Sequence, residues 1–407
     1  MHAKIHSISI IGIAKFFVLI FILYIFWFFE AISESRFVLY GTAIASTLFI
    51  LIDMKMTGRN LDAGVYSIIP LLFVYGVYSL LSGIVVSTDR EYFVSSMITY
   101  FAFMIMCYNV CYISNSEQSI DWLIDMMYFV ALICTIQTVF WGKTVRSSHF
   151  WVTTMGEKNN PNSLGLVMLI GIFAALNRNN YQKRFLFSIL SSIVFLYVIV
   201  LCGSRKCLIG AVGLIFLWLF LAFFQDTSKN VFKRLSKIIL ILGGVAVVVF
   251  YLQHYFGATA AFERFQNIEI GSSYNGRLLL YKRALDLWLA NPFFGVGYNQ
   301  YVVVSGTEVY THSTYAEILA CTGIFGVVIW IGYFFRMVKT LIQDIRQSKK
   351  TPMFYRKLMN LIMLLIEMFI GLGQIWFYEI PHLFVLTFIF GFAYVENQSR
   401  LCSYYED

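Results

Sequence analysis

The feature that most constrains this fold is a series of about twelve apolar stretches, most of them near the roughly 20 residues that a helix needs to cross a hydrocarbon layer. They are too long for β-barrel strands and do not alternate, so helices are the expected spanning structure. Composition agrees: 13% of the residues are charged, whereas soluble domains carry about 25%. We therefore expect an all-α polytopic integral membrane protein. The expected spans are Ile8–Phe29, Phe37–Ile52, Val65–Val86, Phe93–Ile113, Ile120–Trp141, Ser163–Leu176, Phe185–Cys202, Leu208–Phe224, Ile238–His254, Ala316–Val338, Leu358–Phe377 and His382–Val395.

Basic residues predict the orientation of these spans. With the N-terminus in the cytoplasm, most of the 30 Lys and Arg residues fall in inner segments, as the positive-inside bias requires. Both termini are then cytoplasmic, and the net charge of +8 needs no nucleic acid to explain it. We expect residues 1–407 to form a single membrane domain. Residues 255–315, between the ninth and tenth spans, become a long outer loop whose helical patterning predicts a folded cap.

Within this loop, "NGRLLLYKRALDLWLANPFFGVGYNQY" covers Asn275–Tyr301. From Arg277 to Ala290 the apolar residues recur every three or four positions, which predicts an amphipathic helix ending at Asn291-Pro292. One interpretation is a helix that lies on the lipid headgroups, where its basic residues contact phosphates. The expected apolar face and the basic residues are Leu278, Tyr281, Leu285, Trp288, Arg277, Lys282 and Arg283.

Two glycines follow this helix. Gly295 and Gly297 permit a tight turn at which the backbone can approach a ligand closely. They make a poor dinucleotide fingerprint, because no strand precedes them and the third glycine is missing.

A second element is "LCGSRKCLIG", where two apolar spans are joined by a few residues. Arg205 and Lys206 stand at the outer boundary, where positive charge opposes the insertion bias. One interpretation is a phosphate site, because arginine pairs bidentately with phosphate oxygens. The alternative is an ordinary pair of basic residues at a helix end whose side chains extend to the lipid headgroups. A third outer element is "MGEKNNPNSLG", in which Asn162 or Ser163 is positioned to cap the next helix.

His312 ends the long loop, next to three hydroxyl residues. An imidazole with a pKa near 6.5 can accept a proton from a hydroxyl near neutral pH, although a lone histidine is more often structural. The charge count places His312, Arg277 and Arg205 on one side of the membrane. No Cys/His spacing predicts a metal site, and the seven cysteines do not form a disulfide pattern.

These motifs together resemble the O-antigen ligase and Wzy-type polymerase superfamily. The resemblance covers roughly residues 155–330: an Arg-led helix, Asn-Pro-x-x-Gly-x-Gly, a His-led motif ending in Gly-x-x-Gly, a Ser-Arg element and an Asn-containing turn before a span. Ser313, Ala316 and Cys321 depart from residues that are frequent in the family. The matching positions are Arg277, Asn291, Pro292, Gly295, Gly297, His312, Glu317, Gly323 and Gly326.

The resemblance implies a GT-C-like, metal-independent glycosyltransferase of the bacterial cytoplasmic membrane that needs no cofactor. Its donor would be an oligosaccharide on polyprenyl (undecaprenyl) pyrophosphate, and its acceptor a sugar hydroxyl. As a polymerase it would extend a lipid-linked repeat unit, with a chain-length regulator as a candidate partner; as a ligase it would transfer glycan to a lipid core or protein.

Roles follow by residue. Arg205 and Arg277 are assigned to the pyrophosphate, because fixed guanidiniums stabilise the charge of the leaving group. His312 is assigned to accept or orient the acceptor's proton. Lys206, Lys282 and Arg283 are expected as electrostatic helpers. Glu317 is expected to orient the imidazole, with Glu308 and Glu379 as acidic alternatives.

A membrane transporter is the competing class. Asp125, Glu367 and Gln374 are polar residues within expected spans, which often mark ion pathways. They are scattered and no inverted repeat accompanies them. For Glu367 we expect pairing with a neighbouring helix inside the bundle.

Overall fold

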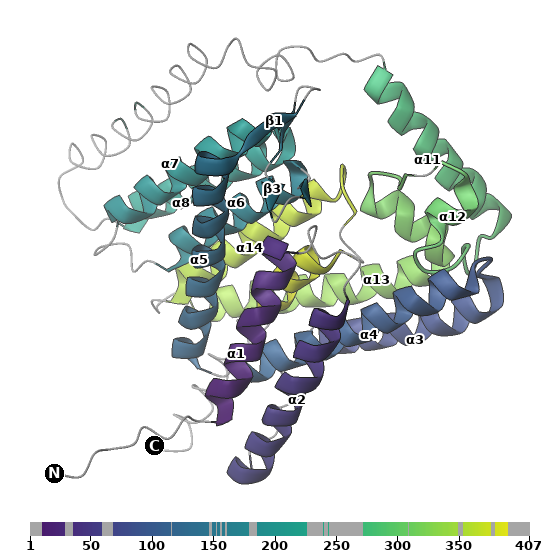
Figure 1. The fold of residues 1–407 in the computed structure, drawn as a ribbon, viewed down its shortest axis with the longest axis horizontal. Helices are drawn as coiled ribbons and strands as arrows, with labels where there is room; N and C mark the ends of the chain where they lie inside the picture. The colour runs from purple at the N-terminus through teal and green to yellow at the C-terminus, as the bar shows by residue number, and fades with distance from the viewer. Residues whose placement is uncertain are drawn as a thin grey trace.

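The chain folds as a bundle of long helices in a computed structural model (Figure 1). Two short hairpins are the exception to the helical fold among the described residues; they lie between the fifth and sixth helices. The structure describes residues 10–28, 36–58, 68–114, 116–145, 149–151, 153–154, 157–158, 161–178, 185–225, 239, 243, 272–307, 309–348, 353–375 and 379–389.

The N-terminal half supplies eight helices and a π-helical turn. These are α1 (Ile10–Leu23), η1 (Tyr24–Phe28), α2 (Phe37–Thr57), α3 (Ile69–Val86), α4 (Arg90–Ile113), α5 (Glu117–Trp141), α6 (Pro161–Asn177), α7 (Phe185–Cys202) and α8 (Arg205–Gln225). The hairpins pair β1 (Lys143–Val145) with β2 (His149–Trp151), and β3 (Thr153–Thr154) with β4 (Glu157–Lys158), both antiparallel.

The C-terminal half carries the loop elements and three further helices, of which α13 is long and apolar enough to cross a membrane. It contains α11 (Ser272–Ala290), α12 (Tyr301–Ser305), α13 (Thr314–Gln347), α14 (Met353–Ile370) and the helix Ile380–Ile389.

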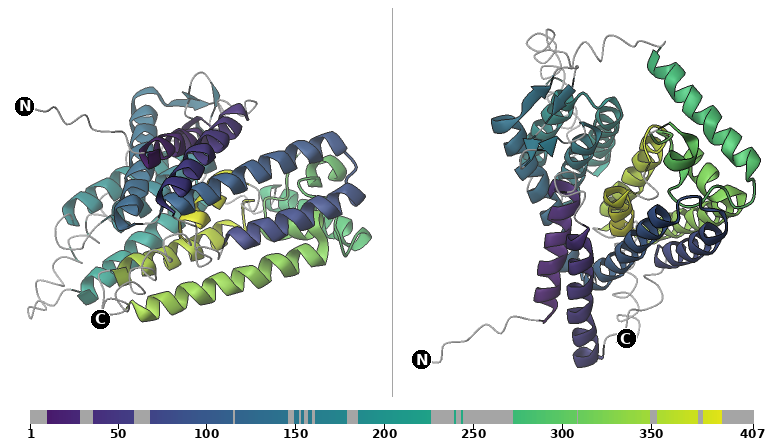
Figure 2. Two further views of the ribbon diagram at one scale, coloured as in Figure 1. Left: turned by 90° about the horizontal axis from the view of Figure 1, so that it is seen from below. Right: turned by 45° about the vertical axis from the view of Figure 1, so that its right-hand side comes forward.

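The helices form neighbouring groups that meet around α14. One group contains α5, α6, α7 and α8. In another, α3 packs against both α4 and α13, and α11 also packs on α13. In the left view of Figure 2 the long helix α13 runs beside α3, and α4 lies beyond α3. Since α14 contacts both α8 and α13, the turn that follows α14 lies where the groups join.

Helix ends from distant parts of the sequence are joined by hydrogen bonds. The Asp89 amide before α4 donates to Oε1 of Gln300 before α12 at 3.1 Å. Ser204, before α8, donates to Oδ1 of Asn162 at the start of α6 at 3.0 Å. The motifs "GSRK" and "NNPNSLG", 42 positions apart, are thereby joined.

The expected spans correspond to helices wherever the chain is described. The ninth, Ile238–His254, lies outside the described residues apart from two positions, and α13 extends nine residues beyond the end expected at Val338. By length and composition, six described helices are long and apolar enough to cross a membrane, and three more are shorter apolar helices. The chain is thus a multi-helix membrane protein, and the count of twelve spans is not confirmed.

The face of α11 that packs on the protein differs from the apolar face expected from the sequence. Leu278 and Leu285 are exposed, while Leu280, Ala284 and Leu287 are buried. The buried residues pack with Val296, Tyr301, Ala320 and Cys321. Both sets recur every three to four residues, so the periodicity alone did not distinguish the face that packs on α13.

Candidate functional site

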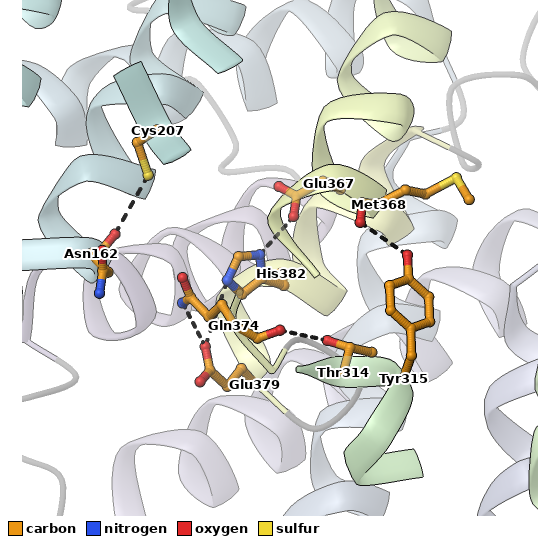
Figure 3. Close-up of polar contacts among 9 residues, drawn as sticks. All are labelled: Asn162, Cys207, Thr314, Tyr315, Glu367, Met368, Gln374, Glu379 and His382. Carbon is orange, nitrogen blue, oxygen red and sulfur yellow. Dashed lines mark hydrogen bonds and ion pairs between the residues drawn. The ribbon is translucent and has the colours of Figure 1, made fainter. Parts of the chain in front are cut away.

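The start of α13 is fixed to the turn that ends α14. The Thr314 amide donates to the carbonyl of Gly371 at 2.9 Å, and its Oγ1 donates to the carbonyl of Gln374 at 2.7 Å. Tyr315 donates from its hydroxyl to the carbonyl of Met368 at 2.9 Å (Figure 3). The last carbonyls of a helix lack intrahelical partners, so these donors satisfy groups that would otherwise be left open. This turn positions the residues that surround it.

The start of α8 reaches the same turn. Nζ of Lys206 donates to the carbonyl of Gly373 at 2.8 Å. Arg205, the first residue of α8, has an exposed side chain. The N-terminus of a helix attracts anions, because its first amides point outward without partners. Two cationic side chains thus stand at a helix end that already favours negative charge.

His312 is held in an uncommon backbone conformation. Its φ is +58°, in the left-handed region, where histidine is found more often than most residues. The loop around it is fixed by the Thr311 hydroxyl, which donates to the Ser313 carbonyl at 2.8 Å and accepts from the Ser313 amide at 3.1 Å. The Tyr310 ring lies 4.5 Å from the imidazole, centroid to centroid. The backbone and its neighbours therefore restrict where the imidazole points.

Glu317 acts on this loop from within α13. Its side chain is fully buried, and Oε2 accepts from the Thr311 amide at 2.9 Å. Ser313 is the N-cap of α13, with its Oγ accepting from the Ala316 amide. The expected role for Glu317 was to orient the imidazole. The contact described here fixes the backbone one residue before His312.

Positive charge surrounds the imidazole. Burial is the main cause that lowers the pKa of His312 to about 4, and the charges of Arg277 and Lys206 lower it further. His312 is therefore neutral at pH 7. Lys206 also interacts electrostatically with Arg277 and with Glu379. Side chains from α8, α11, the loop before α13 and the segment after α14 thus share one electrostatic site.

The other predicted basic residues lie at the edge of this site or beyond it. Arg283 donates from Nε to the Ser305 carbonyl at 3.3 Å, which ties α11 to α12. Lys282 and Arg277 are exposed on α11. Among the described residues, no ion pair involves Arg205, Arg277 or Lys282. Glu308 lies outside the described residues.

Gly295 and Gly297 approach a helix where we had expected a ligand. The Val296 and Gly297 amides donate to the carbonyls of Ala320 and Cys321, each at 2.9 Å. These carbonyls are available because α13 is broken at Gly323, whose φ is +62° and ψ −168°. The Ile324 amide, beyond the break, donates to the Pro292 carbonyl at 2.9 Å. The Asn-Pro-x-x-Gly-x-Gly loop therefore fills a gap in a helix.

A buried group beside the turn after α14 contains one residue that the sequence reasoning missed, His382. Nδ1 of His382 lies 2.6 Å from Oε2 of Glu367, and these side chains are 0% and 1% exposed. Nε2 of His382 lies 3.6 Å from Oε2 of Glu379, which also accepts from Nε2 of Gln374 at 3.1 Å (Figure 3). The spacing Glu379-x-x-His382 at the start of a helix was the available signal.

The polar residues that motivated the transporter hypothesis have partners within the protein. Glu367 pairs with His382 of the neighbouring helix, which confirms the expected pairing inside the bundle. Asp125 lies 2.8 Å from Nε of Arg178. The side chain of Gln374 donates to Glu379 at 3.1 Å.

The fold and site together define a helical membrane protein with a cationic site where several helix ends meet. Comparison with known families is more specific: residues 190–331 match the family model described as O-antigen ligase, roughly a third of the chain. This match confirms the resemblance drawn from the motifs. It supports a membrane-bound, glycosyltransferase-like enzyme that processes glycans as ligases or polymerases of this type do.

Two other comparisons complete the picture. A solved chain described under "Structural coordination of polymerization and crosslinking by a peptidoglycan synthase complex" is 12% identical, with a TM-score of 0.49 over 83% of this chain and 98% of that chain. None of the curated proteins compared matches this sequence.

Proposed function

We propose that this protein is a polysaccharide repeat-unit polymerase of the bacterial cytoplasmic membrane. It transfers an oligosaccharide from polyprenyl pyrophosphate to a sugar hydroxyl of a second lipid-linked unit, at a site that faces away from the cytoplasm. The observation that supports this most is the shared electrostatic site of Arg277, Lys206 and His312, contributed by three separate elements.

The cations serve the leaving group. As the glycosidic bond breaks, its electron pair moves to the pyrophosphate, and fixed positive charge near lipid stabilises that charge. Arg277 supplies a planar fork for two phosphate oxygens, and Arg205 and Lys206 act from the first turn of α8. Lys282 extends the same positive field along α11.

The imidazole serves the acceptor. A neutral His312 at pH 7 has a nitrogen lone pair that can accept a hydrogen bond from the sugar hydroxyl and orient it toward the anomeric carbon. Its low pKa reflects burial and the nearby cations. Binding of an anionic pyrophosphate would neutralise those cations and raise the basicity of His312 when the donor is in place.

A ligase fits the same residues. The donor chemistry is shared, and only the acceptor differs: a lipid core or protein in place of a second repeat unit. The match to an O-antigen ligase family model favours keeping this second candidate.

The test is an assay of purified enzyme in liposomes with the lipid-linked oligosaccharides that accumulate in cells lacking it. A ladder of products on a gel supports a polymerase, and a single transfer to added lipid core supports a ligase. No product from either reaction would contradict both.

Variants then test the site. We expect Arg277→Ala to lower kcat by about 100-fold or more. Arg277→Lys should retain part of the activity, because lysine keeps the positive charge but cannot pair bidentately with phosphate oxygens. Lys339→Ala, which removes an exposed charge from the other half of α13, is the matched control and should leave activity unchanged.

A further inference from the structure

In the buried group after α14, two side chains are placed where they can position the third, Glu379. Three polar side chains lie in a row: Glu367 in α14, His382 in the last described helix, and Glu379 before that helix (Figure 3). The first two are no more than 1% exposed, whereas the side chain of Glu379 is 31% exposed. The row therefore leads from the helix core to a carboxylate that solvent or substrate can reach.

The central imidazole has an incomplete set of hydrogen bonds. Nδ1 is paired with Glu367, but the fully buried Nε2 has no hydrogen-bond partner in the described part of the chain and points to Glu379 at 3.6 Å. A buried polar atom left open is costly, so such a position calls for a functional explanation. A protonated ring would donate Nδ1–H to Glu367 and aim Nε2–H at Glu379.

Glu379 belongs to the cationic site. Lys206 interacts electrostatically with it as well as with Arg277. Gln374 binds the Glu379 carboxylate through its side chain and the start of α13 through its carbonyl, and so connects Glu379 to the loop of His312.

We propose, in an inference that rests on the proposed function, that Glu379 accepts the proton released in the transfer. Glu367 and His382 are positioning residues that hold its carboxylate in place. The acceptor oxygen forms a bond to the anomeric carbon while the bond to the pyrophosphate oxygen breaks and its electron pair leaves with the pyrophosphate. The hydroxyl proton moves to the Glu379 carboxylate and passes to water after the product departs. His312 orients the hydroxyl in this scheme.

The charges around Glu379 suit that task. Burial, the largest effect, and the Glu367 carboxylate raise its pKa, while His382 and Lys206 lower it, and the net result is a pKa above the ordinary value. A carboxyl group whose pKa lies above its ordinary value is a better proton acceptor than an imidazole whose pKa is about 4.

Four variants test this in the liposome assay, with the lipid-linked oligosaccharides of the deletion strain as donor and acceptor. Glu379→Gln should lower kcat by about 100-fold or more, with the KM for the donor within twofold, and Glu379→Asp should keep part of the activity. His382→Gln should lower kcat by about tenfold or more. Glu367→Gln should also lower kcat and leave KM unchanged.

The pH profile separates positioning from simple structural support. Because His382 lowers the pKa of Glu379, His382→Gln should move the acidic limb of the kcat profile to higher pH. The control is Thr387→Val, a near-isosteric change of a fully buried residue on the same helix, which should leave the limb in place.

Two results would overturn the inference. One is full activity of Glu379→Gln, a variant expected to fold because the Glu379 side chain is partly exposed. The other is a folded His382→Gln protein whose kcat profile keeps its acidic limb at the wild-type pH. A wild-type enzyme without transferase activity would instead overturn the proposed function. The two failures are therefore distinguishable.

Discussion

Replacing Gly295 by alanine should destabilise the protein far more than the same change at Gly306. Both glycines lie in the left-handed region, with φ of +69° and +68°, so the backbone cost of about 1–2 kcal/mol is common to both. Their surroundings differ. A Cβ at Gly306 meets no atom within 4 Å, whereas at Gly295 it would lie 2.5 Å from the Cys321 carbonyl carbon and 2.6 Å from the Ala320 oxygen.

The difference can be worked out from these contacts. The loop must move away from α13 by about 1 Å to restore ordinary contact distances, which strains the hydrogen bonds from Val296 and Gly297 to α13. Two lost hydrogen bonds cost about 2 kcal/mol, and the steric overlap adds about 1–3 kcal/mol. Gly295→Ala should thus cost about 3–5 kcal/mol more than Gly306→Ala.

The assay is thermal unfolding of both variants in the same detergent, compared with donor KM in liposomes. We expect a modestly lower Tm for Gly306→Ala, from the backbone cost alone, and a much lower Tm for Gly295→Ala. Equal Tm values, with a raised KM for Gly295→Ala alone, would refute this reasoning and restore the expectation that Gly295 faces a ligand.

Three further predictions test the site. Because the pKa of His312 is low, the unfolded chain binds a proton between pH 6.5 and about 4 that the folded chain does not, so this residue makes stability fall as pH falls through that interval. Asparagine tolerates a positive φ, so His312→Asn should remain folded. The variant should show a smaller fall in the unfolding midpoint between pH 7 and pH 5 than the wild type. His312→Asn should also lower kcat with the protein still folded in the membrane, and wild-type kcat would reduce His312 to a loop residue. A chelator should leave the purified enzyme active, and loss of activity that added metal restores would contradict a metal-independent transfer.

The sequence predicted helices at the expected spans, wherever the chain is described, because the bilayer sets their length and lipid their composition. Arg277, Lys206 and His312 were also recognisable, since charged or titratable groups at the ends of apolar helices are conspicuous. The two motifs around Asn162 and Ser204 were each identified, but only the fold joins them.

Other features depend on tertiary contacts that no local pattern encodes. Gly323 sits in an otherwise continuous apolar stretch, and the break appears only because Pro292 and Val296 bond to the freed backbone. The sequence "LLL" at 278–280 offers more than one apolar face, and packing on α13 selected Leu280. His382 was overlooked because its partner Glu367 lies 15 positions away in another helix.

The break in α13 also determines where the chain can change length. The segment 292–297 is held in register by a helix that comes later in the sequence, so one added residue there would displace every backbone bond to that helix. Gly306 has open space around it, and an insertion there would lengthen the chain without disturbing those bonds. Related enzymes that vary in this region should therefore keep the first segment constant and accommodate their insertions in the second.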